Sequence, residues 1–247
     1  MALSREQMDG EIEEAVSHFW DSRLRQARSQ KKRGKADQGA RAAVTGGAQM
    51  DGFVELITGL VRKAGLPKPK IHRDKKLELP GYFRPTKQWD LLVVVDGMVL
   101  AVVEAKSQVG PSFGNNFNNR TEEAIGSAVD FWTAYREGAF GGSPRPWLGY
   151  LFLLEDSPKS RSPVKVAEPH FEVLQEFKEA SYMLRYELLC RKLVRERHYE
   201  GVSFITSPQP VGKKVSFSQP AADLTFGKFA ASLTAHVSTF ASIGLKR

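Results

Sequence analysis

Three charged residues stand at the ends of two strongly apolar segments near the middle of the chain. Asp90 comes directly before the run LLVVV, and Glu104 and Lys106 close the run MVLAVV. Hydrolysis of a phosphodiester needs a divalent metal that neutralises charge on the phosphoryl oxygens, a water that loses a proton, and a stabilised leaving oxygen. Hard cations such as Mg²⁺ take carboxylate oxygens. Two acids with a lysine beside them supply the minimal set, so these residues are the candidate catalytic centre.

The pattern Glu-x-Lys is common by chance, and its structural context decides its value. A second copy, Glu176 and Lys178, falls in a predicted helix and is interpreted as a chance match. The alternative for the first copy is a salt bridge at a strand end. We favour catalysis, because two acids and a lysine around one buried hairpin would be costly to keep for stability alone. Glu55 is a fourth candidate acid, as a ligand for a second metal or a partner of the metal-bound water, or else an exposed helical carboxylate.

The elements that must position the first three residues are two short strands, 89–95 and 98–105, joined at Asp96–Gly97. An Asp-Gly pair between apolar runs is a strong signal for a β-hairpin. Both strands are almost continuously apolar. We therefore expect both faces of their sheet to be covered by helices.

Side chains alternate between the two faces of a strand, so the pairing of this hairpin decides whether the three charged residues share a face. Glu104 and Lys106 share a face, and Asp90 joins them only if even-numbered residues pair with even-numbered residues. A two-residue turn would set Asp90 opposite Val103, on the wrong face. We therefore predict a three-residue loop with a bulge, or an equivalent bulge nearer Asp90. The loop would set Asp90 opposite Val102, with Glu104 as its diagonal neighbour.

The rest of the chain alternates between apolar-periodic and irregular segments. Helices are predicted at 6–29, 50–64, 120–136, 171–197 (with one break allowed near 179–181) and 224–243, further strands at 147–154 and 202–206, and irregular structure at 34–47, 66–85 and 110–119. This order favours an α/β fold with a sheet between helices. We predict one domain over 1–247, with 1–48 as a helical and basic extension and 49–247 as the catalytic core.

Composition limits the class of protein. The chain has 247 residues and a formal net charge of +8, which suits an anionic partner such as nucleic acid but also an ordinary cationic protein. Basic residues gather between Arg23 and Lys35, where phosphate contact and a solvated helix end are equally good interpretations. The single Cys190 excludes an intrachain disulfide and is expected to be a buried structural thiol. No apolar run reaches the ~20 residues that span a bilayer, and the charged first residues do not resemble a signal peptide, so we expect a cytoplasmic protein.

Two segments resemble XhoI-type restriction endonucleases of the PD-(D/E)XK nuclease superfamily. Residues 89–108, WDLLVVVDGMVLAVVEAKSQ, carry the superfamily feature, and residues 114–132, GNNFNNRTEEAIGSAVDFW, are similar to this restriction enzyme family in particular. Trp89 stands where the superfamily often has a proline. The resemblance covers most of the chain. It implies the restriction-endonuclease-like fold, with a mixed central β-sheet flanked by helices and an N-terminal helical extension.

The same resemblance implies a function. The expected protein is a homodimer that binds a palindrome in double-stranded DNA, CTCGAG in the family, and cleaves both strands with Mg²⁺ to leave 5′-phosphates and 5′ overhangs. Carried over by position, Asp90 and Glu104 bind the metal, the Ala105 carbonyl is a further ligand, and Lys106 positions or activates the attacking water. A cognate methyltransferase would protect host DNA and need not bind this chain.

The Asn-rich segment after the second strand is the candidate for reading bases. Asn pairs in a bidentate manner with adenine, and Arg with guanine. The alternative is turn chemistry, because Asn is common in loops and at helix caps, and Asn119 in particular could only cap the next helix. We favour base contacts for two or more of these residues, because four Asn in five residues exceed what a turn requires. The candidate DNA-binding residues are Asn115, Asn116, Asn118, Asn119 and Arg120.

Two rival functions remain open at this point. Another PD-(D/E)XK nuclease, such as a repair or junction-resolving enzyme, reads DNA shape and would not need the Asn-rich segment. A non-catalytic DNA-binding protein would not need the two acids and the lysine on one face of the hairpin.

Overall fold

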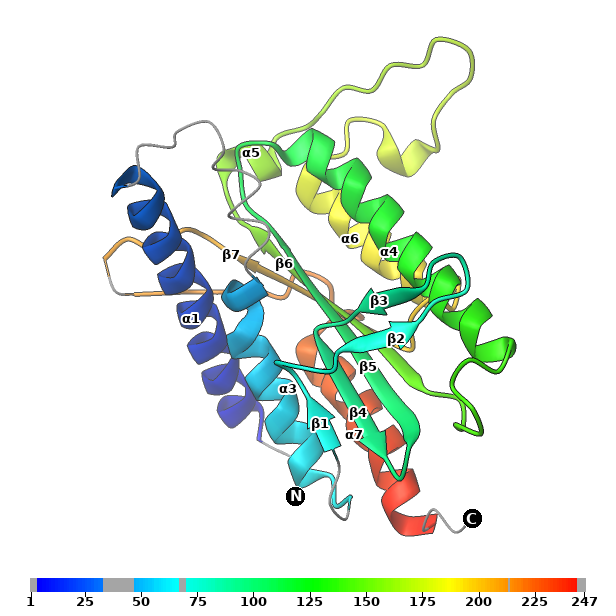
Figure 1. Cartoon of the computed structure of the whole chain (residues 1–247). Helices are drawn as coiled ribbons and strands as arrows, with labels where there is room; N and C mark the ends of the chain where they lie inside the picture. The colour runs from blue at the N-terminus through cyan, green and yellow to red at the C-terminus, as the bar shows by residue number, and fades with distance from the viewer. Residues whose placement is uncertain (1–3, 33–46, 67–69, 213, 244–247) are drawn as a thin grey trace.

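A five-stranded mixed sheet lies at the centre of the fold, in the strand order β1-β4-β5-β6-β7 (Figure 1). The computed structural model describes residues 4–32, 47–66, 70–212 and 214–243. The strands are β1 (Lys70–His72), β4 (Leu91–Val95), β5 (Met98–Gln108), β6 (Trp147–Glu155) and β7 (Gly201–Ser207). Pairing is antiparallel between β1, β4 and β5 and parallel between β5, β6 and β7. The predicted α/β fold with a mixed sheet is confirmed.

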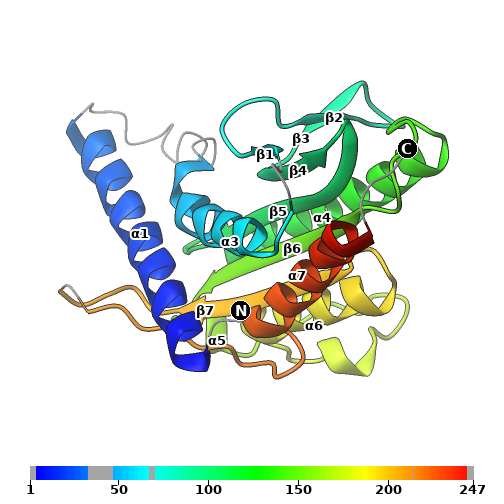
Figure 2. The same ribbon diagram turned by 90° about the horizontal axis from the view of Figure 1, so that it is seen from below.

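Helices cover both faces of this sheet, as Figures 1 and 2 show. One face carries α1 (Arg5–Lys32), α3 (Asp51–Lys63) and α7 (Phe226–Ile243), and the other carries α4 (Phe113–Arg136) and α6 (Tyr182–Arg195). Each layer encloses its own apolar core, so the central strands bury side chains on both sides. Val103 lies in the α3/α7 core and its neighbour Val102 in the α4/α6 core. The prediction of a sheet covered on both faces is therefore correct.

The segment 66–85, predicted to be irregular, contributes the two short strands β1 and β2 (Glu78–Pro80), and a third short strand, β3 (Thr86–Gln88), follows directly after it. β1 is an edge strand of the main sheet, and β2 pairs with β3 as a separate two-stranded hairpin. Strands of three residues are too short to show a period of two. Their pairing partners, rather than their own sequence, make them strands.

The Asn-rich segment is helical, which corrects the predicted loop. α4 begins at Phe113 instead of Arg120, so Asn119 lies inside the helix and does not cap it. Asn and Gly have low helix propensity, which favours a loop on sequence grounds. Packing overrides this preference: Phe113 is buried under the first turn, and Phe117, one turn later, packs edge-on against Tyr186 with ring centroids 5.1 Å apart.

The predicted helix at 171–197 is helical only in its second half. α6 begins at Tyr182, where the Ser181 hydroxyl caps it by accepting a hydrogen bond from the N–H of Leu184 (3.2 Å). Before it, the chain projects from the body of the protein (Figure 1) and contains one short 3-10 turn, η2 (Gln175–Phe177). The apolar residues that imitated a helical stripe here are exposed, Phe171 at 88%. They have no core to pack against, and a helix of this length depends on such packing.

Several other predictions hold. The helices at the start and end of the chain, α3 with Gly65 (φ 85°) just after it, and strands β6 and β7 lie where the sequence predicts them. Cys190 is buried, and burial raises the pKa of its thiol far above the usual value. Within the described ranges, no helix is long and apolar enough to cross a membrane. The predicted loop at 34–47, and Arg33 and Lys35 of the basic run, fall almost wholly outside the described residues.

Candidate active site

The β4–β5 hairpin turns on two residues, so the three-residue loop predicted for it is wrong. Val95 pairs with Met98, and the residues between them, Asp96 and Gly97, have φ angles of 50° and 80°. Two positive φ angles in a two-residue turn give a twist that matches that of the flanking strands. Continued without irregularity, this register would set the candidate acids on opposite faces.

A bulge one step farther along corrects the register. Val94 pairs with Val99, but Val93 pairs with Ala101, so Leu100 is an extra residue on β5. The shifted register pairs Leu91 with Val103, so these two side chains share one face and Asp90 and Glu104 lie on the other. The bulge nearer Asp90, the second form of the prediction, is therefore the one that occurs. The extra residue, Leu100, lies in β5, two residues beyond the start of that strand.

All three candidate catalytic residues consequently point to the α4/α6 side of the sheet. Lys106 Nζ forms a close ion pair with Glu104 Oε1 and lies 3.8 Å from Asp90 Oδ2. Asp90 Oδ2 also accepts a hydrogen bond from the backbone N–H of Ala105 (2.8 Å). Glu104 is buried, whereas Asp90 and Lys106 keep 30% and 26% of their side-chain surface exposed. The site therefore opens to solvent through Asp90 and Lys106.

A second lysine, which sequence reasoning missed, completes the cluster. Lys87 Nζ donates to Glu104 Oε2 at 2.8 Å, and only 12% of its side chain is exposed. It stands on β3, between the segment 66–85, predicted to be irregular, and the first predicted hairpin strand at 89–95. One lysine among several in a Lys- and Pro-rich stretch carries no signal of its own, because the β2–β3 hairpin has to form before Lys87 reaches Glu104.

The charges within the cluster shift one another's titration. Burial raises the pKa of Asp90, and the negative charge of Glu104 raises it further, against the effect of Lys106. Burial would also raise the pKa of Glu104, but Lys106 and Lys87 outweigh it and lower that pKa below its usual value. Burial would lower the pKa of Lys106, but the two carboxylates raise it overall. Lys106 is therefore a persistent cation in this arrangement.

The donor set fits a small hard cation. Asp90, Glu104 and the carbonyl of Ala105 offer oxygen ligands only. Over the described part of the chain, no three side chains of the types His, Cys, Asp and Glu gather into a cluster. Mg²⁺ is commonly held by one or two carboxylates while waters and substrate phosphates complete its shell. Two acids on one face of the sheet are enough carboxylates for such a Mg²⁺ site, whereas a metal that prefers thiolate or imidazole ligands finds none here.

Glu55, the fourth candidate acid, is not brought to this cluster. It lies on α3, which packs on the opposite face of the sheet, and half of its side chain is exposed. Its carboxylate forms ion pairs with Arg73 and, at 3.6 Å, with Arg62. The exposed helical carboxylate, the alternative interpretation, describes this position.

The candidate DNA-binding residues occupy the first turns of α4. Asn115, Asn118 and Asn119 are exposed, while Asn116 is partly buried. Arg120 Nη1 donates to Glu123 Oε2 at 2.5 Å, and the charge of Arg120 is among those that act on the pKa of Lys106. Three of the four Asn side chains therefore face solvent, and Arg120 lies close enough to the acid–lysine cluster for its charge to act on Lys106.

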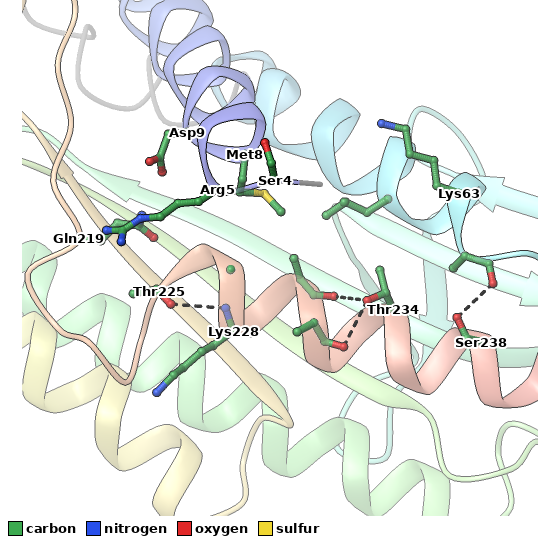
Figure 3. Close-up of a pocket in the computed structure, with 15 residues that line it drawn as sticks. Ser4, Arg5, Met8, Asp9, Lys63, Gln219, Thr225, Lys228, Thr234 and Ser238 are labelled. Carbon is green, nitrogen blue, oxygen red and sulfur yellow. Dashed lines mark hydrogen bonds between the residues drawn. The ribbon is translucent and has the colours of Figure 1, made fainter. Parts of the chain in front are cut away.

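A cavity of about 680 Å³ lies elsewhere, between α1, α3 and α7 (Figure 3). Figure 3 shows Arg5, Asp9, Lys63 and Lys228 around it. Asp9 is the one carboxylate among its lining residues. The cavity therefore lacks an acid pair, and it is separated from the acid–lysine cluster by the sheet.

An acid pair with adjacent lysines on a buried hairpin is the kind of site that metal-assisted phosphodiester hydrolysis uses. Residues 29–219 match the family described as "Restriction endonuclease XhoI", and the chain belongs to this family. The type II restriction enzyme BstVI of Geobacillus stearothermophilus is 53% identical over 212 residues, which cover 84% of this chain and 95% of BstVI.

Two further relatives agree. The type II restriction enzyme XhoI of Xanthomonas vasicola is 50% identical over 78% of both chains. AbrI of Azospirillum brasilense, also a type II restriction enzyme, is 52% identical over 69% of this chain and 77% of its own. No solved structure matches the chain. The protein is a type II restriction enzyme, a site-specific deoxyribonuclease, which confirms the predicted family and enzyme class and excludes a non-catalytic DNA-binding protein.

Proposed function

We propose that this enzyme cleaves both strands of a palindromic site, CTCGAG, by Mg²⁺-dependent hydrolysis, leaving 5′-phosphates and 5′ overhangs. Asp90 and Glu104 are the metal ligands, the Ala105 carbonyl is a third, and Lys106 acts on the attacking water. The observation that carries the proposal is the convergence of Asp90, Glu104 and Lys106 on one face of the hairpin. The proposed DNA sequence rests on the family resemblance.

Each residue of the proposed site has a definable task. Bound Mg²⁺ would neutralise charge on the phosphoryl oxygens. The N–H of Ala105 holds Asp90 Oδ2, so the carboxylate enters the site in one orientation. Lys106 lies beside both carboxylates and supplies positive charge next to them. Such a charge orients the attacking water and stabilises developing negative charge.

The first turns of α4 are the proposed base-reading element. A helix fits the major groove of B-DNA, where the adenine and guanine edges are distinguishable. Asn115, Asn118 and Asn119 share the exposed side of α4, and the charge of Arg120, the next residue, acts on Lys106 of the cluster. Asn116, partly buried, and Arg120 complete the proposed set. Reading bases from a helix replaces the loop that the sequence suggested and keeps the same residues.

A homodimer is part of the proposal, because a two-fold symmetric site is matched by a two-fold symmetric protein. Each subunit would then supply one cluster to one strand. The cytoplasm remains the predicted compartment. A cognate methyltransferase would protect the same sequence in the host.

The proposal is tested by digesting a plasmid of known sequence with wild-type enzyme and Mg²⁺, and sequencing the ends. We expect cuts at CTCGAG with 5′ overhangs, and none when a chelator removes the metal. Asp90→Ala and Lys106→Ala should abolish cleavage while binding to the site persists in a gel-shift assay. Cleavage at another sequence would overturn the proposed specificity. Unchanged cleavage by both variants would overturn the proposed site.

A further inference from the structure

Lys87 is held in place by groups outside the acid pair. Its ammonium group donates to the Gln88 carbonyl at 3.2 Å and lies 4.3 Å from the centre of the Trp89 ring. Trp89 is itself buried and packs edge-on against Phe131 of α4, with centroids 5.4 Å apart. These contacts hold the Lys87 ammonium group in the position from which it donates to Glu104 Oε2.

The β2–β3 hairpin, which carries Lys87, is also held in place, by hydrogen bonds from its turn to Asp130. Asp130 of α4 is buried, and its Oδ1 accepts hydrogen bonds from the N–H groups of Tyr82 and Phe83, both at 2.8 Å. Its Oδ2 accepts from Arg84 Nε at 2.7 Å. Gly81 fits tightly beside this clamp, since a Cβ there would come within 2.7 Å of Asp130 Oδ2. The turn of the β2–β3 hairpin is therefore tied to the helix that covers the site.

The two lysines on Glu104 consequently differ. Lys106 contacts both acids and is the more exposed of the two lysines. Lys87 contacts Glu104 but not Asp90, and it is also held by the Gln88 carbonyl and the Trp89 ring. With Oε2 held by Lys87, the remaining oxygen Oε1 faces Asp90 through Lys106. Oε1 is paired with Lys106, so a cation shared with Asp90 would take the place of that ammonium group at Oε1, while Lys87 keeps Oε2 in position.

We propose that Lys87 is a positioning residue of this enzyme, which fixes the Glu104 carboxylate so that Oε1 and Asp90 together face a divalent cation. This inference rests on the proposed function, in which Asp90 and Glu104 hold the metal. Groups that orient metal ligands typically contribute 10–100-fold to metal affinity or activity.

Charge alone makes the opposite prediction. An ammonium group next to a metal site repels a divalent cation, so its removal should tighten metal binding. Positioning predicts that its removal weakens metal binding, because Glu104 is then free to turn. A purely structural role predicts a lower melting temperature with unchanged metal affinity and turnover. The sign of the change in metal affinity therefore separates the three roles.

The experiment compares wild type with Lys87→Met, which keeps the length and apolar stem of the side chain. Lys75→Met, an exposed lysine on the same segment, is the matched control. Binding of Mn²⁺ alone is titrated calorimetrically without DNA, and kcat and KM are measured with Mg²⁺ and plasmid. We expect Lys87→Met to weaken Mn²⁺ binding and to lower kcat, each about 10-fold or more, with KM within about threefold. Lys75→Met should match wild type.

Equal or tighter Mn²⁺ binding by folded Lys87→Met would overturn the inference. If that variant does not fold, Lys87→Gln, which is polar and too short to reach Glu104 Oε2, carries the same expectation and the same refutation. Wild type and Asp90→Ala are measured alongside. A wild type that neither binds Mn²⁺ nor cuts DNA contradicts the proposed function itself, whereas normal wild type with an unaffected Lys87→Met contradicts only the role of Lys87.

Discussion

The chain contains the pattern Glu-x-Lys twice, and the glutamate and lysine pair with each other in only one of the two copies. Glu104 and Lys106 lie on β5, point to one face and pair with each other. Glu176 lies in η2 and pairs with Lys192 of α6, while Lys178 pairs with Glu172 at 2.8 Å, so the two do not meet. Residues two apart share a face only in an extended strand. The pattern acquires chemical meaning from the strand beneath it.

Burial separates the two copies further. The Glu104 side chain is 4% exposed and that of Glu176 is 41% exposed. An exposed ion pair contributes little because water and salt screen it, whereas a buried charge must be compensated. The first copy therefore keeps its partners close, while the second is part of a solvated surface.

The largest difference should appear in catalysis. Lys106→Ala removes the fixed cation of the site and should lower the cleavage rate by about 10²–10⁴-fold, the range of a catalytic side chain. Lys178→Ala should change the rate less than twofold, because Lys178 touches only exposed acids. Initial rates on supercoiled plasmid measure both. A Lys178→Ala variant as slow as Lys106→Ala would break the comparison.

The next difference should appear in folding free energy. Glu104→Ala leaves Lys87 without a carboxylate and Lys106 with Asp90 alone in a largely buried site, and we expect a loss of roughly 3 kcal/mol. Glu176→Ala removes one exposed pair and should cost at most about 1 kcal/mol. Urea unfolding of both variants gives the two values. Equal losses would mean that burial of the first copy carries no energetic consequence.

A smaller effect is expected at Asp130, which supports the first copy through the β2–β3 hairpin. Burial would raise the pKa of Asp130, but the hydrogen bonds from Arg84, Phe83 and Tyr82 outweigh it and lower that pKa below its usual value. Asp130→Asn should cost about 1–3 kcal/mol at neutral pH. Because the folded pKa is the lower one, this contribution is present above the ordinary Asp pKa and disappears as the pH falls through the folded pKa.

Urea unfolding of wild type and Asp130→Asn, repeated at pH 7 and in increasingly acidic buffers, tests this. The difference between the two proteins should shrink as the pH falls. If the difference in unfolding free energy stayed constant or grew in acid, the Asp130 carboxylate would not stabilise the hairpin in its ionised form.

The smallest effect is expected at the pair Glu176–Lys192. Both side chains are about two-fifths exposed, so a double-mutant cycle with Glu176→Gln and Lys192→Met should give a coupling of about 0.2–1 kcal/mol that weakens with added salt. A coupling energy above this range would contradict the expectation and would mean that the second copy contributes to the stability of the fold.

Much of the site was predictable because it depends on local pattern. Apolar runs around Asp96–Gly97 predict the hairpin, and alternation demands a register correction before Asp90 can meet Glu104. The position of the bulge was not predictable, because Leu100 resembles its neighbours and only pairing reveals which residue is extra. The role of Lys87 could not be predicted either, because its contact with Glu104 joins two strands that lie apart in the sequence.

Helix boundaries failed where packing and propensity disagreed. The first turns of α4 are rich in poor helix formers, yet Phe113 and Phe117 anchor them to the core. In the segment before α6, Phe171 and Leu174 show helical spacing but lie exposed. A periodic stripe predicts a helix only when there is a surface for the stripe to cover.

The Leu100 bulge changes the parity of the pairing between β4 and β5. At the turn an odd-numbered residue pairs with an even-numbered one, as Val95 does with Met98, whereas beside the site odd pairs with odd, as Leu91 does with Val103. Adding or removing one residue between turn and site would reverse this relation and send Asp90 and Glu104 to opposite cores. The hairpin can therefore change length over evolution in steps of two, while a single-residue change would separate the acids without replacing either of them.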